Sequence, residues 1–296
     1  MADPHTTITQ GSIDAGGLEF AYLSAGSGPL ALCLHGFPDT AWGWRHLLPA
    51  LAEAGYRAVA PFMRGYAPTA IPPSGYFQTG ALAGDAVALH EALGGDGDAV
   101  IIGHDWGAPA AYGAAALAPE RWRRVVGAAV PPGGALGRGF FTFDQLQRSW
   151  YMFFFQHALA DVVVPMDDLA FIDRLWKDWS PGHDPGEDMD HVRRALGTSE
   201  NLAAALGYYR ATLGDGPRDP DLDAAQAAAN TMPPQPLLYL HGADDGCVGL
   251  EVAETARAEL TAPGSRMEVV DGAGHFLFVE QPEVVNRLVV EFLAEG

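Results

Sequence analysis

The chain has 296 residues and a formal net charge of −20, from 17 basic and 37 acidic side chains. This length predicts one large domain, or a core that carries a sizeable insertion. Apolar residues make up 48% of the sequence, which predicts a packed core and excludes wholesale disorder. An acidic surface repels phosphate backbones and anionic lipids, so neither nucleic acid nor a membrane is an expected partner.

The cysteine content and the N-terminal sequence indicate a cytoplasmic protein. Cys33 and Cys247, the two cysteines, match no zinc-ligand spacing and cannot form a disulfide framework. The first residues lack the basic and then apolar stretches of a signal peptide, and no run reaches the roughly 18–20 apolar residues of a membrane helix. No metal-ligand pattern is found. We therefore expect a soluble monomer or homodimer that uses neither metal nor cofactor.

Short apolar runs alternate with helical patterns in the first and last parts of the chain. The runs expected to form buried strands lie at 30–34, 57–60, 99–102, 125–130, 237–240 and 267–270. The stretches with helical spacing lie at 81–93, 108–117 and 283–293. This alternation predicts a mostly parallel sheet flanked by helices.

The middle of the chain differs, because no convincing buried strand occurs between residues 131 and 234. Aromatic-rich helical patterns take its place. Proline and glycine pairs bracket the segment at both ends, as they often do at the boundaries of an insertion. We therefore expect an α/β core in two segments, 1–132 and 233–296, with a helical cap at 133–232 between them.

A Gly-His-Asp-Trp-Gly sequence at 103–107 directly follows the strand expected at 99–102 and precedes an alanine-rich helix. Two small residues around a nucleophile, at a strand-to-helix junction, are typical of the nucleophile elbow of α/β-hydrolases. A serine there must lose a proton before it attacks a carbonyl carbon, whereas a carboxylate of ordinary pKa near 3.9 is already ionised. Asp105 is therefore a candidate nucleophile that forms an ester with a saturated carbon. The alternative interpretation is a helix N-cap aspartate.

Hydrolysis of such an ester requires a base and an acid that orients it. His275 lies on a glycine-flanked loop after the last expected strand, from which it can reach over the strand ends and activate water. The acid should follow the strand at 237–240, where Asp245 and Asp244 are alternatives and one of them is a plain turn residue. Backbone N–H groups of Phe37 and Trp106 are the candidate oxyanion donors, worth about 3–4 kcal/mol each.

Together these residues resemble the epoxide hydrolases of the α/β-hydrolase superfamily. The resemblance covers nearly the whole chain, through His-Gly-Phe-Pro at 35–38, Arg-Gly-Tyr at 64–66, the elbow at 103–107 and Gly-His-Phe at 274–276. The spacing in that family favours Asp245 over Asp244 as the orienting acid. The resemblance also implies that two cap tyrosines donate hydrogen bonds to the epoxide oxygen, and Tyr151 and Tyr209 match their positions.

Such donors suit the chemistry, because ring opening develops an alkoxide that leaves well only when it is protonated or hydrogen-bonded. A phenol of pKa near 10 stays protonated at neutral pH and can supply that proton. Trp150 and Tyr208 are the nearest competitors in register, and packing within the cap is the alternative use of these aromatics. Trp150, Phe154 and Tyr208 are expected to bind the substrate, which we predict to be an apolar or aromatic epoxide.

The core motifs are shared with haloalkane dehalogenases, which is the nearest competing interpretation. Those enzymes hold the departing halide between two N–H donors. Trp106 could supply the first, and the candidates for the second are Trp150, Trp176 and Trp179. A further alternative is a protein that binds small molecules on the same fold without catalysis. The interpretation that we favour is hydrolysis of an epoxide to a vicinal diol.

Overall fold

The computed structural model describes residues 5–295, and its centre is an eight-stranded sheet. The strand order is β1-β2-β4-β3-β5-β6-β7-β8. The strands span Thr9–Ala15 (β1), Leu18–Gly26 (β2), Leu30–Leu34 (β3), Arg57–Pro61 (β4), Val100–His104 (β5), Arg124–Ala128 (β6), Leu237–Gly242 (β7) and Arg266–Val270 (β8). Strands β3 to β8 are parallel, whereas β2 pairs antiparallel with both β1 and β4. The predicted α/β class and mostly parallel sheet are confirmed.

The six strands expected from apolar runs are all present, but β1 and β2 were not predicted. Strands β3, β5 and β6 are buried along their whole length, as expected for strands covered on both faces. In β1, by contrast, most side chains are exposed or half-buried. A search for continuous apolar runs therefore finds the central strands and misses a hairpin at the edge.

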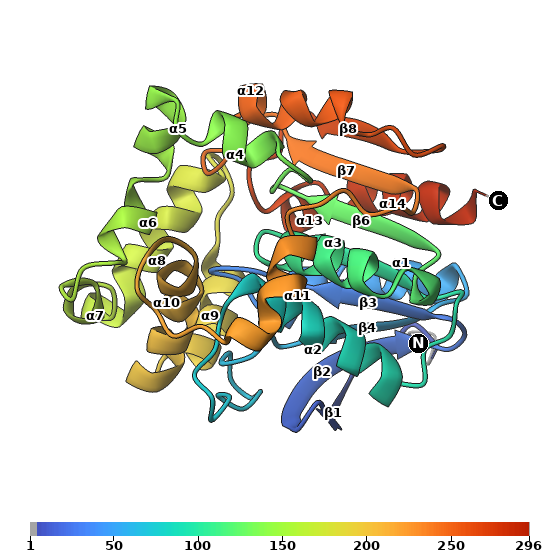
Figure 1. Ribbon diagram of the computed structural model, residues 1–296, viewed down its shortest axis with the longest axis horizontal. Helices are drawn as coiled ribbons and strands as arrows, with labels where there is room; N and C mark the ends of the chain where they lie inside the picture. The colour runs from blue at the N-terminus through green and yellow to red at the C-terminus, as the bar shows by residue number, and fades with distance from the viewer. Residues whose placement is uncertain (1–4, 296) are drawn as a thin grey trace.

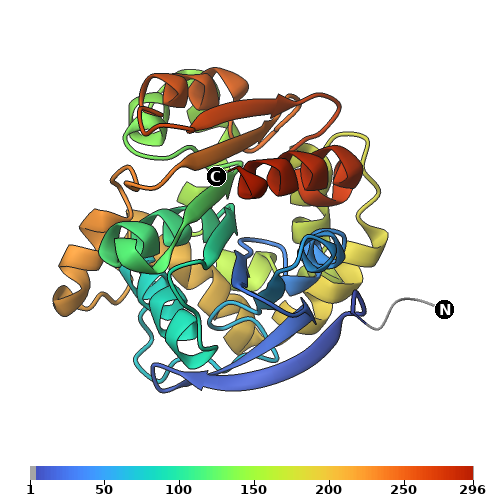
Figure 2. The same cartoon turned by 90° about the vertical axis from the view of Figure 1, so that its right-hand side faces the viewer.

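Helices cover both faces of the sheet (Figure 2). On one face α1 (Leu47–Glu53) packs against α14 (Pro282–Ala294), and on the other α2 (Thr79–Ala92) packs against α3 (Gly107–Leu117). The shorter elements of the core are η1 (Ala41–Trp44), η2 (Pro119–Arg121), α12 (Leu250–Ala253), η4 (Glu254–Ala258) and α13 (Leu277–Glu280). The three long helices that the sequence predicts correspond to α2, α3 and α14.

Every described element between β6 and β7 is helical. These elements are α4 (Ala135–Gly139), α5 (Phe143–Arg148), α6 (Trp150–Phe154), α7 (Ala160–Val163), α8 (Met166–Trp179), α9 (Gly186–Leu196), α10 (Ser199–Leu213), η3 (Pro220–Leu222) and α11 (Asp223–Ala228). Helices α6 to α10 gather at one end of the sheet (Figure 1), whereas α4 packs against α12 and α11 against α2 and α3. The insertion thus includes a cap and two helices seated on the core. Its limits at 133 and 232 stay a prediction.

Within residues 5–295, no helix has the length and apolar character that crossing a bilayer requires. The absence of a signal peptide was inferred from the N-terminal sequence, of which residues 1–4 lie outside the described residues, as does residue 296.

Candidate active site

Asp105 lies on the turn between β5 and α3. Its φ of +50° falls in the left-handed region, which residues with a side chain seldom adopt. Strand and helix approach so closely that a Cβ on Gly103 would lie 2.1 Å from the carbonyl oxygen of Gly107. Glycine is therefore required at position 103. The turn leaves the Asp105 carboxylate on the wall of a cavity between the core and the cap.

The loop after β3 holds one oxygen of this carboxylate. The backbone N–H of Phe37 donates to Asp105 Oδ1 at 2.6 Å. A Cβ on Gly36 would lie 2.2 Å from Asp105 Oδ1 and 2.4 Å from the backbone nitrogen of Trp106, so this position also requires glycine. Of the two predicted oxyanion donors, Phe37 thus bonds this oxygen, and the backbone nitrogen of Trp106 lies beside the same glycine.

The ring of His35 keeps that loop in place. Its Nε2 lies 2.9 Å from the backbone N–H of Met63, and its Nδ1 lies 2.9 Å from the carbonyl oxygen of Gly36. A neutral imidazole satisfies both partners when Nδ1 carries the proton. Burial, which outweighs the neighbouring groups, lowers the pKa of His35 to about 4 and favours this neutral form.

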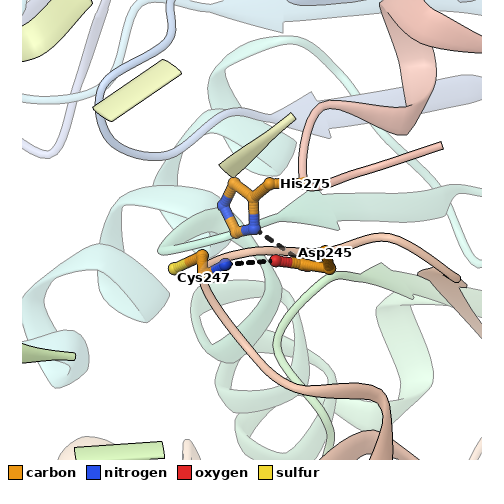
Figure 3. Close-up of side chains that lie close together, drawn as sticks. All are labelled: Asp245, Cys247 and His275. Atoms are coloured by element: carbon orange, nitrogen blue, oxygen red, sulfur yellow. Dashed lines mark hydrogen bonds and ion pairs between the residues drawn. The ribbon is translucent and has the colours of Figure 1, made fainter. Parts of the chain in front are cut away.

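His275 and Asp245 form a buried pair on the loops that follow β8 and β7 (Figure 3). His275 Nδ1 lies 3.0 Å from Asp245 Oδ2, and His275 Nε2 lies 3.5 Å from Asp105 Oδ2. Two backbone N–H groups donate to Asp245 Oδ1, at 2.7 and 3.0 Å. Asp244 is exposed. The structure therefore brings Asp245, and not Asp244, to the imidazole.

Charge decides the protonation of this pair. Burial by itself lowers the pKa of His275, but the carboxyl groups of Asp245 and Asp105 outweigh burial and raise it to about 10. Burial by itself raises the pKa of Asp245, but the charge and hydrogen bond of His275 hold it below its ordinary value. At neutral pH the resting imidazole is therefore protonated, and it lies between the two carboxyl groups.

Two cap tyrosines line the same cavity as Asp105. Tyr151 comes from α6 and Tyr209 from α10, and their ring centroids are 5.7 Å apart. The hydroxyl of Tyr209 has no hydrogen-bond partner within residues 5–295, whereas that of Tyr151 lies 3.3 Å from Cys247 Sγ. Burial, helped by neighbouring groups that include Asp105, raises the pKa of both phenols well above the ordinary value. Both phenols therefore keep a proton to donate.

The cavity has a volume of about 550 Å³ and mostly apolar walls. The apolar lining includes Trp106, Pro109, Leu136, Phe140, Met152 and Leu213. Among the described residues that line it, Asp105 is the only one with a charged side chain. A charged group buried without a partner costs several kcal/mol, so this cavity suits an uncharged, apolar molecule.

The three predicted substrate-binding residues are not brought to this cavity. Tyr208 lies outside its lining, and the Tyr208 hydroxyl instead donates to the carbonyl oxygen of Arg64 at 2.9 Å. Adjacent residues of a helix point about 100° apart. Because Tyr209 faces the cavity, the side chain of Tyr208 turns toward the core loop instead.

Trp150 and Phe154 also lie outside the lining. Trp150 is 49% exposed, and both rings pack against Phe171 of α8. These side chains hold the cap helices together, which is the alternative use that the sequence left open. The structure therefore gives no support to a substrate-binding role for Trp150, Phe154 or Tyr208.

Most residues of the lining were not identified from the sequence, among them Gln145, Met152 and Cys247. Gln145 and Met152 lie on α5 and α6, and their apolar or amide character is common on any cap helix. Cys247 stands two residues after Asp245, and that short spacing was the only signal that pointed to it.

Asp245, Cys247 and His275 are the one described group of side chains close enough to hold a metal ion, with ligand atoms within 4.8 Å of one another. Burial, with the carboxyl groups of Asp245 and Asp105, raises the pKa of Cys247 well above its ordinary value. A protonated thiol is a poor metal ligand, because thiolate is the binding form. The group therefore fits a hydrogen-bonded acid–base pair better than a metal centre.

Known proteins resemble this chain over almost its full length. The α/β hydrolase fold family matches residues 29–282. Epoxide hydrolase A of Mycobacterium tuberculosis is 30% identical, over 96% of this chain and 97% of that protein. An epoxide hydrolase of Caballeronia sordidicola is 28% identical, over 97% of this chain and 94% of that protein. The structure of an epoxide hydrolase from an endophytic Streptomyces has a TM-score of 0.79 at 28% identity, covering 97% of this chain and 95% of the other.

Proposed function

This chain belongs to the epoxide hydrolase family of α/β-hydrolases, and from that premise we propose that it converts an epoxide into a vicinal diol through an ester on Asp105. One arrangement carries the proposal. A carboxylate on the cavity wall has two protonated phenols in the same cavity and an imidazole–carboxyl pair on its other side. Ring opening needs the carboxylate and the phenols, and ester hydrolysis needs the imidazole.

In the first step the carboxylate opens the ring. Oδ1 of Asp105 is held by the N–H of Phe37, so Oδ2 is the oxygen that attacks a ring carbon. The electron pair of the broken C–O bond passes to the ring oxygen, which accepts hydrogen bonds from Tyr209 and Tyr151 and takes a proton from one of them. Oδ1 of Asp105, still bonded by the N–H of Phe37, becomes the carbonyl oxygen of the ester.

In the second step His275 activates a water molecule. Ester formation removes the negative charge of Asp105, which is one of the causes that raise the pKa of His275. The imidazolium can then pass its proton, through water, to the phenolate that ring opening leaves, and the neutral imidazole becomes the base. Water then attacks the ester carbonyl, and Asp245 orients and stabilises the imidazolium that forms. Backbone N–H groups of Phe37 and Trp106 stabilise the oxyanion. When this intermediate collapses, the bond between the carbonyl carbon and the ester oxygen breaks and the diol oxygen takes the second proton of the former water. Asp105 is then again a carboxylate and His275 an imidazolium.

The substrate that we expect is an uncharged epoxide with an apolar or aromatic body. A volume of about 550 Å³ lies within the range of cavities that enclose drug-sized ligands. The apolar lining favours a substrate without charge, since no cationic side chain among the described residues faces the cavity to pair with an anion. Specificity for one epoxide would then depend on the shape of this lining.

Haloalkane dehalogenation is less well supported. It needs a second N–H donor beside Trp106, and Trp150, Trp176 and Trp179 are not among the described residues that line the cavity. The indole Nε1 of Trp176 instead donates to the carbonyl oxygen of Pro38 at 3.0 Å. The cap instead brings the phenols of Tyr151 and Tyr209 to the cavity.

The test is the intact mass of the His275→Gln variant after incubation with an aryl epoxide and, separately, with a bromoalkane. Without its base the enzyme should stall at the ester and gain the whole mass of the epoxide. The gain should disappear in an Asp105→Asn, His275→Gln double variant. His157→Gln, at an exposed cap histidine, is the matched control and should turn over without an adduct.

The other outcomes separate the alternatives. An adduct only from the bromoalkane, with release of bromide, would replace the proposal with dehalogenation. No adduct from either reagent, with full binding of the epoxide, would favour a protein that binds small molecules without catalysis.

A further inference from the structure

The two phenols of the cavity differ in what stands behind them. Within residues 5–295 the hydroxyl of Tyr209 has no hydrogen-bond partner. The hydroxyl of Tyr151 lies 3.3 Å from Sγ of Cys247, and either atom can be the donor. Cys247 is 3% exposed and itself lines the cavity. A thiol therefore lies beside the hydroxyl of Tyr151, whereas the side chain that interacts with the phenol of Tyr209 is Trp106.

The backbone of Cys247 is held from two sides. Its N–H donates to Asp245 Oδ1 at 2.7 Å, and its carbonyl oxygen accepts from Gln145 Nε2 at 2.9 Å. In Figure 3 the sulfur points away from the carboxyl group of Asp245 and leaves that contact to the backbone N–H. Gln145 is buried and also bonds Ser149 and Gly249. Asp245 of the core loop and Gln145 of α5 therefore fix the backbone of Cys247 and hold its thiol beside the hydroxyl of Tyr151.

The thiol also keeps its proton. Burial, with the carboxyl groups of Asp245 and Asp105, raises the pKa of Cys247 well above its ordinary value. A protonated thiol is a poor nucleophile, and this excludes covalent chemistry at Cys247 near neutral pH. An S–H group is, however, a weak hydrogen-bond donor, and its nearest polar side-chain contact is the oxygen of Tyr151.

We propose that Cys247 is a positioning residue for Tyr151, whose oxygen accepts the S–H of the thiol while its own O–H donates to the ring oxygen of the epoxide. The inference rests on the proposed function, because it concerns the ring-opening step. The result is a chain of two hydrogen bonds, from thiol to phenol to epoxide, in which each bond polarises the next.

The bond from the thiol grows stronger as the reaction proceeds. When Asp105 Oδ2 bonds to the ring carbon, the C–O electron pair passes to the ring oxygen, which takes the proton of Tyr151. The phenolate left behind accepts the S–H bond of Cys247 more strongly than the phenol did, and such a difference lowers the barrier. The phenolate regains its proton through water from the imidazolium of His275, which thereby becomes the neutral base for ester hydrolysis. The thiol ends unchanged.

The test measures the rate of ester formation in single turnovers with an aryl epoxide, by quenched-flow and intact mass, in a His275→Gln background where the ester accumulates. Cys247→Ala should slow this step about three- to ten-fold, the value of one neutral hydrogen bond. Cys247→Ser should restore the rate to within about two-fold, because a hydroxyl also donates. The dissociation constant of the epoxide should stay constant, since the thiol acts through the phenol.

A cycle with Tyr151→Phe separates this role from packing. Without the phenol oxygen, Cys247→Ala should slow ester formation no further. An equal loss in both backgrounds, or a serine variant as slow as the alanine variant, would overturn the inference. Cys33→Ala, at the buried thiol of β3, is the matched control and should not change the rate. If the His275→Gln protein with Cys247 intact forms no ester at all, the proposed function fails first, which is a distinct result.

Discussion

The core side and the cap side of the active site differ in how their polar groups are hydrogen-bonded. On the core side both carboxyl groups have partners: Asp105 accepts from Phe37, and Asp245 accepts from two backbone N–H groups and binds His275. On the cap side the walls are apolar, and the hydroxyl of Tyr209 has no partner within the described residues. Backbone N–H groups thus hold the two carboxyl groups in fixed positions, whereas the cap side presents a hydroxyl that can donate to a bound ligand.

Many polar contacts join the two sides. Arg45 of the core lies 2.5 Å from Asp188 of α9, and the hydroxyl of Tyr208 donates to the carbonyl oxygen of Arg64. Asp188 and Tyr208 are both buried, so these contacts fix the cap against the loops of the core. This comparison predicts that changes on the core side abolish single chemical steps, whereas changes on the cap side tune them.

The largest effect should come from the core side, with Asp105→Ala. Because the nucleophile is lost, we expect kcat/KM for an aryl epoxide to fall by about 10⁴-fold or more. Chromatographic measurement of the diol checks this prediction. Activity within ten-fold of the starting protein would show that Asp105 is not the nucleophile and would contradict the prediction that changes on the core side abolish a chemical step.

Asp245→Asn should affect the second step alone. Because the amide no longer stabilises the imidazolium of His275, ester hydrolysis should slow by about 10²–10⁴-fold. Ester formation should persist, so the adduct becomes visible by intact mass during turnover. Asp244→Asn, at the exposed neighbour, is the control and should stay within about two-fold. The reverse pattern would make Asp244 the orienting acid.

Smaller effects are expected on the cap side. Tyr209→Phe and Tyr151→Phe should each slow ester formation by about 10–100-fold, because the alkoxide loses one of its two donors. Tyr208→Phe should retain the rate and instead lose about 1 kcal/mol of unfolding free energy, since the carbonyl oxygen of Arg64 loses a bond. Stopped-flow kinetics and urea unfolding measure the two quantities. A large kinetic loss in Tyr208→Phe alone would show that Tyr208, and not Tyr209, is the tyrosine of α10 that donates to the epoxide.

The charged pair on the core side also makes the stability of the protein depend on pH. The pKa of His275 rises from 6.5 to about 10 on folding, so its contribution is complete below about pH 6.5 and is lost as the pH rises through about 10. We expect the unfolding free energy of the starting protein, minus that of His275→Gln, to fall by about 2–3 kcal/mol between pH 7 and pH 9. Urea titrations at several pH values measure it. A difference that grows with pH would contradict the charged pair.

The core side could be anticipated from the sequence because its signals are local. Asp105 stands between two glycines at the end of a buried strand, and His275 stands on a glycine-flanked loop after another. The carboxyl ends of parallel strands meet at one edge of a sheet, so residues 170 positions apart were expected to meet. The sequence did not predict the hairpin of β1 and β2, because an edge strand with an exposed face lacks a continuous apolar run.

The sequence by itself determined the fold class, the helical insertion and the candidate nucleophile, because strand period, helix period and turn chemistry are local properties. Only the tertiary structure decided which of the adjacent aspartates meets the imidazole and which faces of α6 and α10 turn to the cavity. It alone also placed the thiol of Cys247 beside the hydroxyl of Tyr151, 96 positions away in the chain. These choices depend on how distant segments pack against one another, and side chains one position apart differ only in direction, which composition and spacing do not encode.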